Sequence, residues 1–146
     1  PITIMPFGVA VDEFQHICYA HPELTPKERT YQWHLLEEKY MPWRRYENDA
    51  FMERGGYWYH KLHIYLYPFY YINYTLTTMG AMEFKNKYAE DKAAAWQDYL
   101  NLCKTGRSYL ETLRYANLAN PFEPGSVARA CGYTEKILLD QLAQQA

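Results

Sequence analysis

Residues 55–74 are the most informative stretch of this chain for its fold, and they run Gly55-Gly56-Tyr57-Trp58-Tyr59-His60-Lys61-Leu62-His63-Ile64-Tyr65-Leu66-Tyr67-Pro68-Phe69-Tyr70-Tyr71-Ile72-Asn73-Tyr74. From Tyr57 onward, nine of eighteen residues are aromatic, and seven of the nine are tyrosines. A buried phenylalanine needs no polar partner, whereas a tyrosine hydroxyl needs a hydrogen bond or water. The stretch therefore predicts one wall of a wet, partly enclosed surface.

The spacing of polar side chains in this stretch indicates one helical face. They recur at intervals of 4, 4, 3 and 4 residues: His63, Tyr67, Tyr71, Tyr74 and Thr78. Because proline is tolerated only in the first turn of a helix, we expect a helix from about Pro68 to Tyr88, with residues 63–67 as a kinked approach. The opposite face is apolar and is expected to face the core: Phe69, Ile72, Leu76, Met79 and Phe84.

The remaining segments are also typical of helices. Thr25-Pro26-Lys27-Glu28 combines an N-cap, a proline and a capping-box glutamate, which predicts a helix to about Tyr40. Ser108 with Glu111 repeats the capping pattern, and Ser126 begins a last helix with four residues expected to be buried: Val127, Ile137, Leu138 and Leu142. No strand, repeat or linker is predicted. We expect an all-α bundle of about six helices, forming a single domain over residues 1–146.

Charge and cysteine content exclude several classes of function. Seventeen acidic against fifteen basic residues give a net charge of -2, which disfavours nucleic acid as a partner. No run of about 18 apolar residues and no apolar leader is present, so no membrane partner and a cytoplasmic location are expected. The cysteines are three and far apart, which predicts reduced, buried thiols: Cys18, Cys103 and Cys131.

Several separated motifs resemble one enzyme family. Residues 55–76 read Gly-Gly, an aromatic run, Leu-His-Ile-Tyr and Pro-Phe-Tyr-Tyr-Ile-Asn-Tyr-Thr-Leu. This pattern resembles the C-terminal part of the catalytic domain in oligoendopeptidase F-like zinc metallopeptidases, relatives of thimet oligopeptidase. Other matching segments occur in order along nearly the whole chain: residues 11–16, 41–44, 99–106 and 120–122. The resemblance implies a helical fragment of a larger catalytic domain.

The resemblance also implies what the isolated chain lacks. Such an enzyme needs His-Glu-x-x-His and a further ligand to hold zinc beside a general base, and none of the five histidines has this arrangement. His60 and His63 alone are a poor zinc site, because no nearby cysteine or obvious carboxylate completes it. We expect zinc in the parent enzyme, no metal and no peptide hydrolysis in this chain, and the missing N-terminal part of the catalytic domain or self-association as partners.

By resemblance, the chain supplies the substrate side of the site. A histidine and tyrosines of this segment contact the bound peptide and the oxyanion, which assigns Tyr74 and His63 to catalysis and Tyr67 and Tyr71 to binding of short peptide substrates. His60 is the alternative histidine. The other tyrosines are expected to be packing or rim residues: Tyr57, Tyr59, Tyr65 and Tyr70.

Three alternatives stay open from the sequence. The chain could be a non-catalytic peptide-binding or helical interaction module that kept the aromatic wall. It could also be a structural bundle without a ligand. Finally, Trp43, Arg44 and Arg45 could clamp a substrate carboxylate, although an ordinary ion-pair role is favoured for them.

Overall fold

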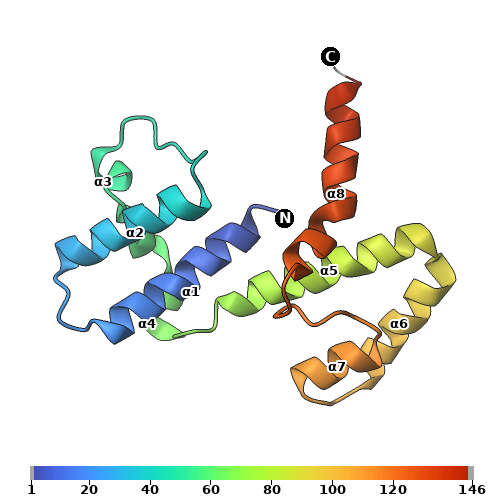
Figure 1. Ribbon diagram of the computed structural model, residues 1–146. Helices are drawn as coiled ribbons and strands as arrows, with labels where there is room; N and C mark the ends of the chain where they lie inside the picture. The colour runs from blue at the N-terminus through green and yellow to red at the C-terminus, as the bar shows by residue number, and fades with distance from the viewer. Residues whose placement is uncertain (1, 145–146) are drawn as a thin grey trace. The chain divides into compact units, whose positions relative to one another are not determined.

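The computed structural model of the chain describes residues 2–144, and every regular element in that range is a helix (Figure 1). Three short helices lie between α2 and α5: α3 (Ala50–Glu53), η1 (Gly56–His60) and α4 (Leu62–Leu66). Six helices have seven residues or more: α1 (Ile4–Ala20), α2 (Pro26–Tyr40), α5 (Ile72–Glu90), α6 (Lys92–Lys104), α7 (Tyr109–Tyr115) and α8 (Ser126–Ala143). The predicted all-α fold with about six helices is confirmed.

The chain divides into two compact units, one ending at Leu76 and the other beginning at Thr77. The first turn of α5 belongs to the first unit, and the rest of that helix belongs to the second. The prediction of one domain over residues 1–146 stays a prediction.

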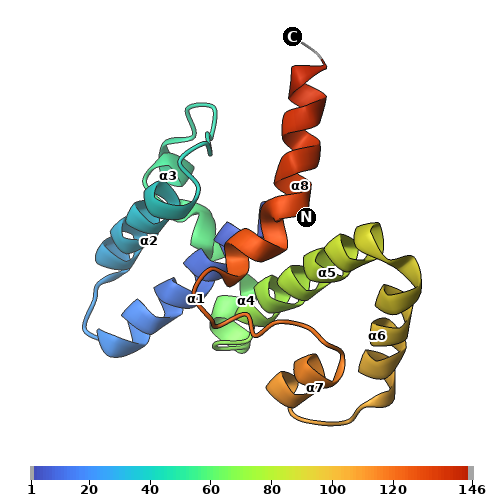
Figure 2. The ribbon, with the colours of Figure 1, turned by 45° about the vertical axis from the view of Figure 1, so that its right-hand side comes forward.

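The first unit is built around a pair of helices, α1 and α2, that pack side by side (Figures 1 and 2). Trp33 of α2 is fully buried, and the rings of Phe7 and Phe14 meet it edge to face, with centroids 6.0 and 5.3 Å away. Each aromatic side chain buries a large apolar area. The buried set of this core is Phe7, Ala10, Val11, Phe14, Trp33, Leu36, Met41, Trp58 and Tyr71.

Two glycines let the aromatic stretch approach this helix pair closely. Gly55 has φ +98°, and a Cβ there would lie 2.3 Å from the carbonyl oxygen of Thr30 in α2. A Cβ on Gly8 of α1 would lie 2.0 Å from Oγ1 of Thr75 at the start of α5. Since only glycine has no Cβ, these residues allow η1 to lie against α2 and the first turn of α5 to lie against α1.

Several predicted helix starts are confirmed. The backbone N–H of Thr25 donates to Glu28 Oε2 at 2.8 Å, and the Glu28 N–H donates to Thr25 Oγ1 at 3.3 Å, which is the capping box. The backbone N–H of Ser108 donates to Glu111 Oε2 at 3.3 Å at the start of α7. The last helix begins at Ser126 as predicted.

The predicted start of the central helix at Pro68 is wrong. α4 ends at Leu66, a turn follows, and α5 begins only at Ile72. Phe69 has φ +58°, a left-handed conformation that interrupts a right-handed helix. Phe69 also does not face the core as predicted, because its ring contacts His16 and Tyr19 at centroid distances of 4.8 and 5.1 Å.

Helix α8 differs most from the prediction of burial in the second unit. Its Ile137 is half-buried, and three other residues predicted to be buried are exposed: Val127 (56%), Leu138 (45%) and Leu142 (63%). Leu139 is also exposed. The helix has the predicted apolar residues, but no part of the chain between residues 2 and 144 covers them.

All three cysteines are free, as predicted. Cys18 and Cys131 are half-buried, whereas Cys103 is exposed, so its predicted burial is wrong. It lies near the end of α6, on a part of that helix that no described segment covers. None of the helices between residues 2 and 144 is both long and apolar enough to cross a membrane.

Candidate functional site

Four tyrosines gather around His63 of α4. The imidazole lies 5.1 Å from the Tyr71 ring and 5.8 Å from the Tyr74 ring between centroids, and both rings meet it edge to face. Tyr70 stacks parallel to the imidazole at 6.2 Å, and Tyr67 lies at 5.9 Å. We call this set, His63 with Tyr67, Tyr70, Tyr71 and Tyr74, the histidine–tyrosine cluster.

The turn between α4 and α5 brings these residues together. The N–H of Tyr70 donates to the Tyr67 carbonyl at 3.2 Å, and the N–H of Tyr74 donates to the Tyr71 carbonyl at 3.1 Å, which shapes the turn and the start of α5. The sequence predicted one helical face for His63, Tyr67, Tyr71 and Tyr74. The structure places the same four residues together by a different route, because a turn over residues 67–71 joins α4 to α5.

Tyr71 fixes the cluster to the core of the first unit. Its side chain is only 8% exposed, and its ring lies 5.6 Å from the Phe7 ring, edge to face. Tyr67, Tyr70 and Tyr74 are 54%, 47% and 36% exposed. The cluster thus has a buried base and an accessible rim, an arrangement that suits a ligand-binding surface.

Tyr74 contacts both His63 and Tyr71 within the cluster. Its hydroxyl lies 3.5 Å from Nε2 of His63, and its ring lies 5.0 Å from the Tyr71 ring. A hydrogen bond with the Tyr70 hydroxyl raises the pKa of Tyr74 above its usual value, and partial desolvation and the neighbouring Tyr70 and Tyr71 act in the same direction. Tyr74 is therefore a neutral phenol at pH 7, able to donate a hydrogen bond.

His60, the alternative histidine, is outside the cluster. Its imidazole stacks on the Tyr57 ring at 5.7 Å in η1. Tyr59 and Tyr65 pack on Phe51 and Trp58, at 5.6 and 5.7 Å. These contacts are those expected of packing or rim residues for Tyr57, Tyr59 and Tyr65.

Tyr70 is the cluster member that the sequence reasoning missed. It was expected to be a packing or rim residue, and it is exposed at the rim, but it also contacts His63, Tyr67 and Tyr74. Helical spacing could not identify Tyr70, because α4 ends at Leu66 and Tyr70 lies in the turn before α5.

The titratable groups of the described residues do not fit a metal centre. Between residues 2 and 144, no three His, Cys, Asp or Glu side chains are grouped so that they could hold a metal ion. The histidine–tyrosine cluster itself offers hydrogen-bond donors and aromatic faces. Such a surface suits a peptide, whose carbonyl groups accept hydrogen bonds.

Comparisons with known proteins fit this description. No protein-family model matches the chain, and no curated protein matches it. Among solved structures, a protein assigned as an oligoendopeptidase F is 46% identical over 92% of the chain, with a TM-score of 0.86. PZ peptidase A, solved with an inhibitor, is 45% identical over 93% of the chain, with a TM-score of 0.87.

A third similar structure is assigned as an oligoendopeptidase F of Bacillus anthracis strain Ames. It is 36% identical over 94% of the chain, with a TM-score of 0.72. The chain covers only 24%, 25% and 22% of these three proteins. It therefore spans about a quarter of the length of the proteins that it matches.

Proposed function

Because the chain is homologous to a segment of the oligoendopeptidase F peptidases, we propose that it forms the substrate-facing wall of a peptidase active site that hydrolyses short peptides. The observation that carries this proposal is the grouping of His63 with Tyr67, Tyr71 and Tyr74 on a buried base. The sequence resemblance assigns these same residues to substrate contact. The proposal places the segment in the C-terminal part of the catalytic domain.

The chemistry of the wall follows from its donors. When an amide is attacked, negative charge develops on the carbonyl oxygen, and neutral donors held close to that oxygen stabilise the transition state more than the ground state. In the proposal, Tyr74 donates to this oxygen, while Tyr67 and Tyr71 bind the peptide. His63 lies 3.5 Å from the Tyr74 hydroxyl, close enough to orient it.

Zinc enters none of these steps. The described residues of this chain do not fit a zinc site. In the proposal, the zinc ligands and the general base lie outside these 146 residues, as the sequence resemblance implies. This chain alone then binds peptide without hydrolysing it, and the remaining part of the catalytic domain is its partner.

Substitution of His63, with His60 as a control, tests the proposed role of the cluster. In a complete peptidase that contains this segment, His63→Gln removes the ring that lies against Tyr74, and kcat/KM should fall on the order of 10²-fold because a misplaced donor no longer meets the oxyanion. His60→Gln is the matched control. It changes the same residue type outside the cluster and should leave kcat/KM unchanged.

The same kinetics separate the proposal from its alternative. If the chain is a non-catalytic peptide-binding or interaction module, His63→Gln alters peptide affinity but no rate of hydrolysis depends on it. Equal kcat/KM values for the His63→Gln variant and the unchanged enzyme, with unchanged circular dichroism, would remove His63 from the site.

A further inference from the structure

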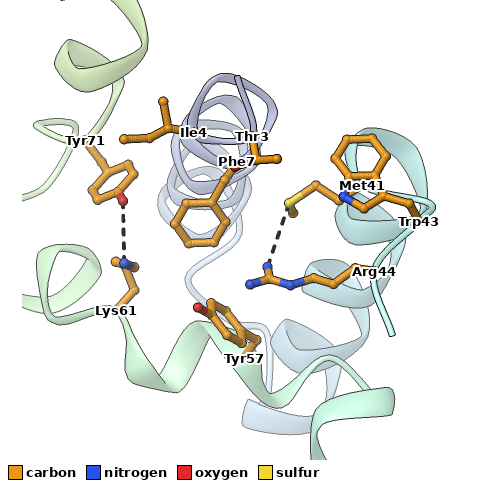
Figure 3. Close-up of a pocket in the computed structure, with 9 residues that line it drawn as sticks. All are labelled: Thr3, Ile4, Phe7, Met41, Trp43, Arg44, Tyr57, Lys61 and Tyr71. Atoms are coloured by element: carbon orange, nitrogen blue, oxygen red, sulfur yellow. Dashed lines mark hydrogen bonds between the residues drawn. The ribbon is translucent and has the colours of Figure 1, made fainter. Parts of the chain in front are cut away.

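A pocket of about 380 Å³ lies in the first unit, beside the histidine–tyrosine cluster but separate from most of it (Figure 3). Its volume falls in the range of ligand pockets, about 300–1,000 Å³. Its walls come from α1 and the residue before it, the loop after α2, η1, Lys61 before α4 and Tyr71 before α5. Nine residues line it: Thr3, Ile4, Phe7, Met41, Trp43, Arg44, Tyr57, Lys61 and Tyr71.

The pocket carries two cationic groups. Figure 3 shows Arg44 and Lys61 reaching the pocket from opposite sides, with the rings of Phe7 and Tyr57 between them. The guanidinium carbon of Arg44 lies 3.8 Å from the centroid of the Tyr57 ring, and Lys61 Nζ lies 4.8 Å from that of Phe7. None of the nine described lining residues is acidic.

The nearby carboxylate does not neutralise both cations. Glu37 is 7% exposed, and its Oε1 lies 3.5 Å from Nη1 of Arg44 and accepts a hydrogen bond from the Tyr46 hydroxyl. Among residues 2–144, no carboxylate forms an ion pair with Lys61. One positive charge is left over at the pocket, and it would attract an anionic group.

The donors of the pocket are already held in place. Arg44 is fixed by Glu37 and by its stack on Tyr57, and Lys61 Nζ lies 3.5 Å from the Tyr71 hydroxyl, to which it donates. Groups that are ordered before binding lose little conformational entropy when a ligand arrives. Arginine is also the residue that pairs best with a planar carboxylate.

From this geometry we infer that the pocket binds the C-terminal carboxylate of a short peptide. The apolar walls of Ile4, Met41 and Trp43 would receive the last side chain of that peptide. Tyr71 belongs both to the pocket and to the histidine–tyrosine cluster, where its ring lies 5.1 Å from the imidazole of His63. A peptide anchored in the pocket by its terminus would therefore pass Tyr71 and reach the cluster.

This inference rests on the proposed function and sharpens it, because it names the substrates as peptides with a free C-terminus. The cluster recognises the peptide backbone, and the pocket sets the distance from the terminus. Arg45, by contrast, donates from Nη1 to the carbonyl oxygens of Pro42 and Arg44, both at 2.7 Å, and does not line the pocket.

The test compares three peptides that differ in their carboxylates. Binding to the 146-residue chain is measured by isothermal titration calorimetry for acetyl-Gly-Gly-Leu with a free carboxylate, for its C-terminal amide, and for acetyl-Gly-Asp-Gly amide. The free acid should bind about tenfold more tightly than its amide, a difference of about 1.4 kcal/mol. The aspartate peptide should bind no better than the amide.

Three variants locate the effect. Arg44→Gln and Lys61→Met should each reduce the preference for the acid to about twofold or less, and added salt should weaken it in the unchanged chain. Arg45→Gln is the matched control, since it removes the same charge one residue away, and it should keep the full preference. Circular dichroism of each variant verifies that the fold survives.

The outcomes separate this inference from the proposed function. Equal binding of acid and amide overturns the carboxylate pocket and leaves peptide binding by the cluster intact. Equal binding of the aspartate peptide and the acid overturns the assignment to the C-terminus. If the folded chain binds none of the three peptides, both this inference and the peptide-binding role fail.

Discussion

The two units of the chain are stabilised in different ways. The first unit buries large aromatic rings around Trp33, whereas the buried hydrophobic residues described in the second unit include no aromatic ring: Met79, Met82, Ala95, Leu113, Ala116, Leu118 and Ala130. The second unit adds a polar network, in which Asp98 accepts from Lys87 Nζ at 2.6 Å and from Asn117 Nδ2 at 2.7 Å. The candidate site and the pocket around Arg44 and Lys61 both lie on the unit with the aromatic core.

The largest expected effect tests the aromatic core directly. Trp33→Ala removes a fully buried side chain from the first unit and should lower the free energy of unfolding by about 3–5 kcal/mol. Trp96→Ala, in the second unit, removes the same side chain where it is 58% exposed and should change it by no more than about 0.5 kcal/mol. Native-state hydrogen exchange measures both changes, in α1 and α2 for the first variant and in α6 for the second. Similar losses in the two variants would contradict the comparison.

A smaller loss is expected for the polar network of the second unit. Asp98→Ala leaves Lys87 without its carboxylate partner and should cost about 1.5–3 kcal/mol, the range for hydrogen bonds to charged groups. Hydrogen exchange in α6 and α7 should report this loss, while protection in α1 stays unchanged. Equal loss of protection in both units would mean that they unfold together.

The same network makes the second unit sensitive to acid. Hydrogen bonds from Lys87 and then from Asn117 lower the pKa of Asp98 below its usual value of about 3.9. A lowered folded-state pKa contributes stability above the unfolded pKa, and this contribution is lost as the pH falls through the folded pKa. Asp98→Asn should therefore flatten the dependence of stability on pH below about pH 4. An unchanged acid branch would show that the network does not contribute.

The two units also show which features of the fold and of the site could be predicted from the sequence. Helix starts could be predicted where the capping hydrogen bonds join residues close in the sequence, as in the capping box of Thr25 with Glu28. The helical spacing of 3 and 4 residues correctly grouped His63 with Tyr71 and Tyr74. It wrongly predicted that one continuous helix carries them. The left-handed Phe69 breaks that helix, and no periodicity argument detects such a conformation at a non-glycine residue.

Burial on α8 was predicted incorrectly for a different reason. An apolar pattern predicts that a face will be covered, but it does not say which part of a protein covers it. Leu138 and Leu142 lie one turn apart and are exposed in this chain. The pocket around Arg44 and Lys61 could not be predicted either, because it depends on residues from four separate segments.

The smallest effect on stability is expected on this exposed face. Leu142→Ser alters a side chain that is 63% exposed, so the free energy of unfolding should change by no more than about 0.5 kcal/mol. If self-association covers the apolar face of α8, the variant should shift toward the monomer in sedimentation velocity, because exposed apolar patches drive association. If the original chain self-associates and Leu142→Ser self-associates equally, the contact lies elsewhere.

The central claim is that the Tyr74 hydroxyl acts on the reacting carbonyl group. In a complete peptidase that contains this segment, Tyr74→Phe keeps the ring and removes only that hydroxyl. We expect kcat to fall about 10²–10³-fold, which corresponds to about 2.7–4 kcal/mol. Tyr65→Phe, outside the cluster, should leave kcat unchanged. An unchanged kcat for Tyr74→Phe would contradict the account, and a raised KM alone would make Tyr74 only a substrate contact.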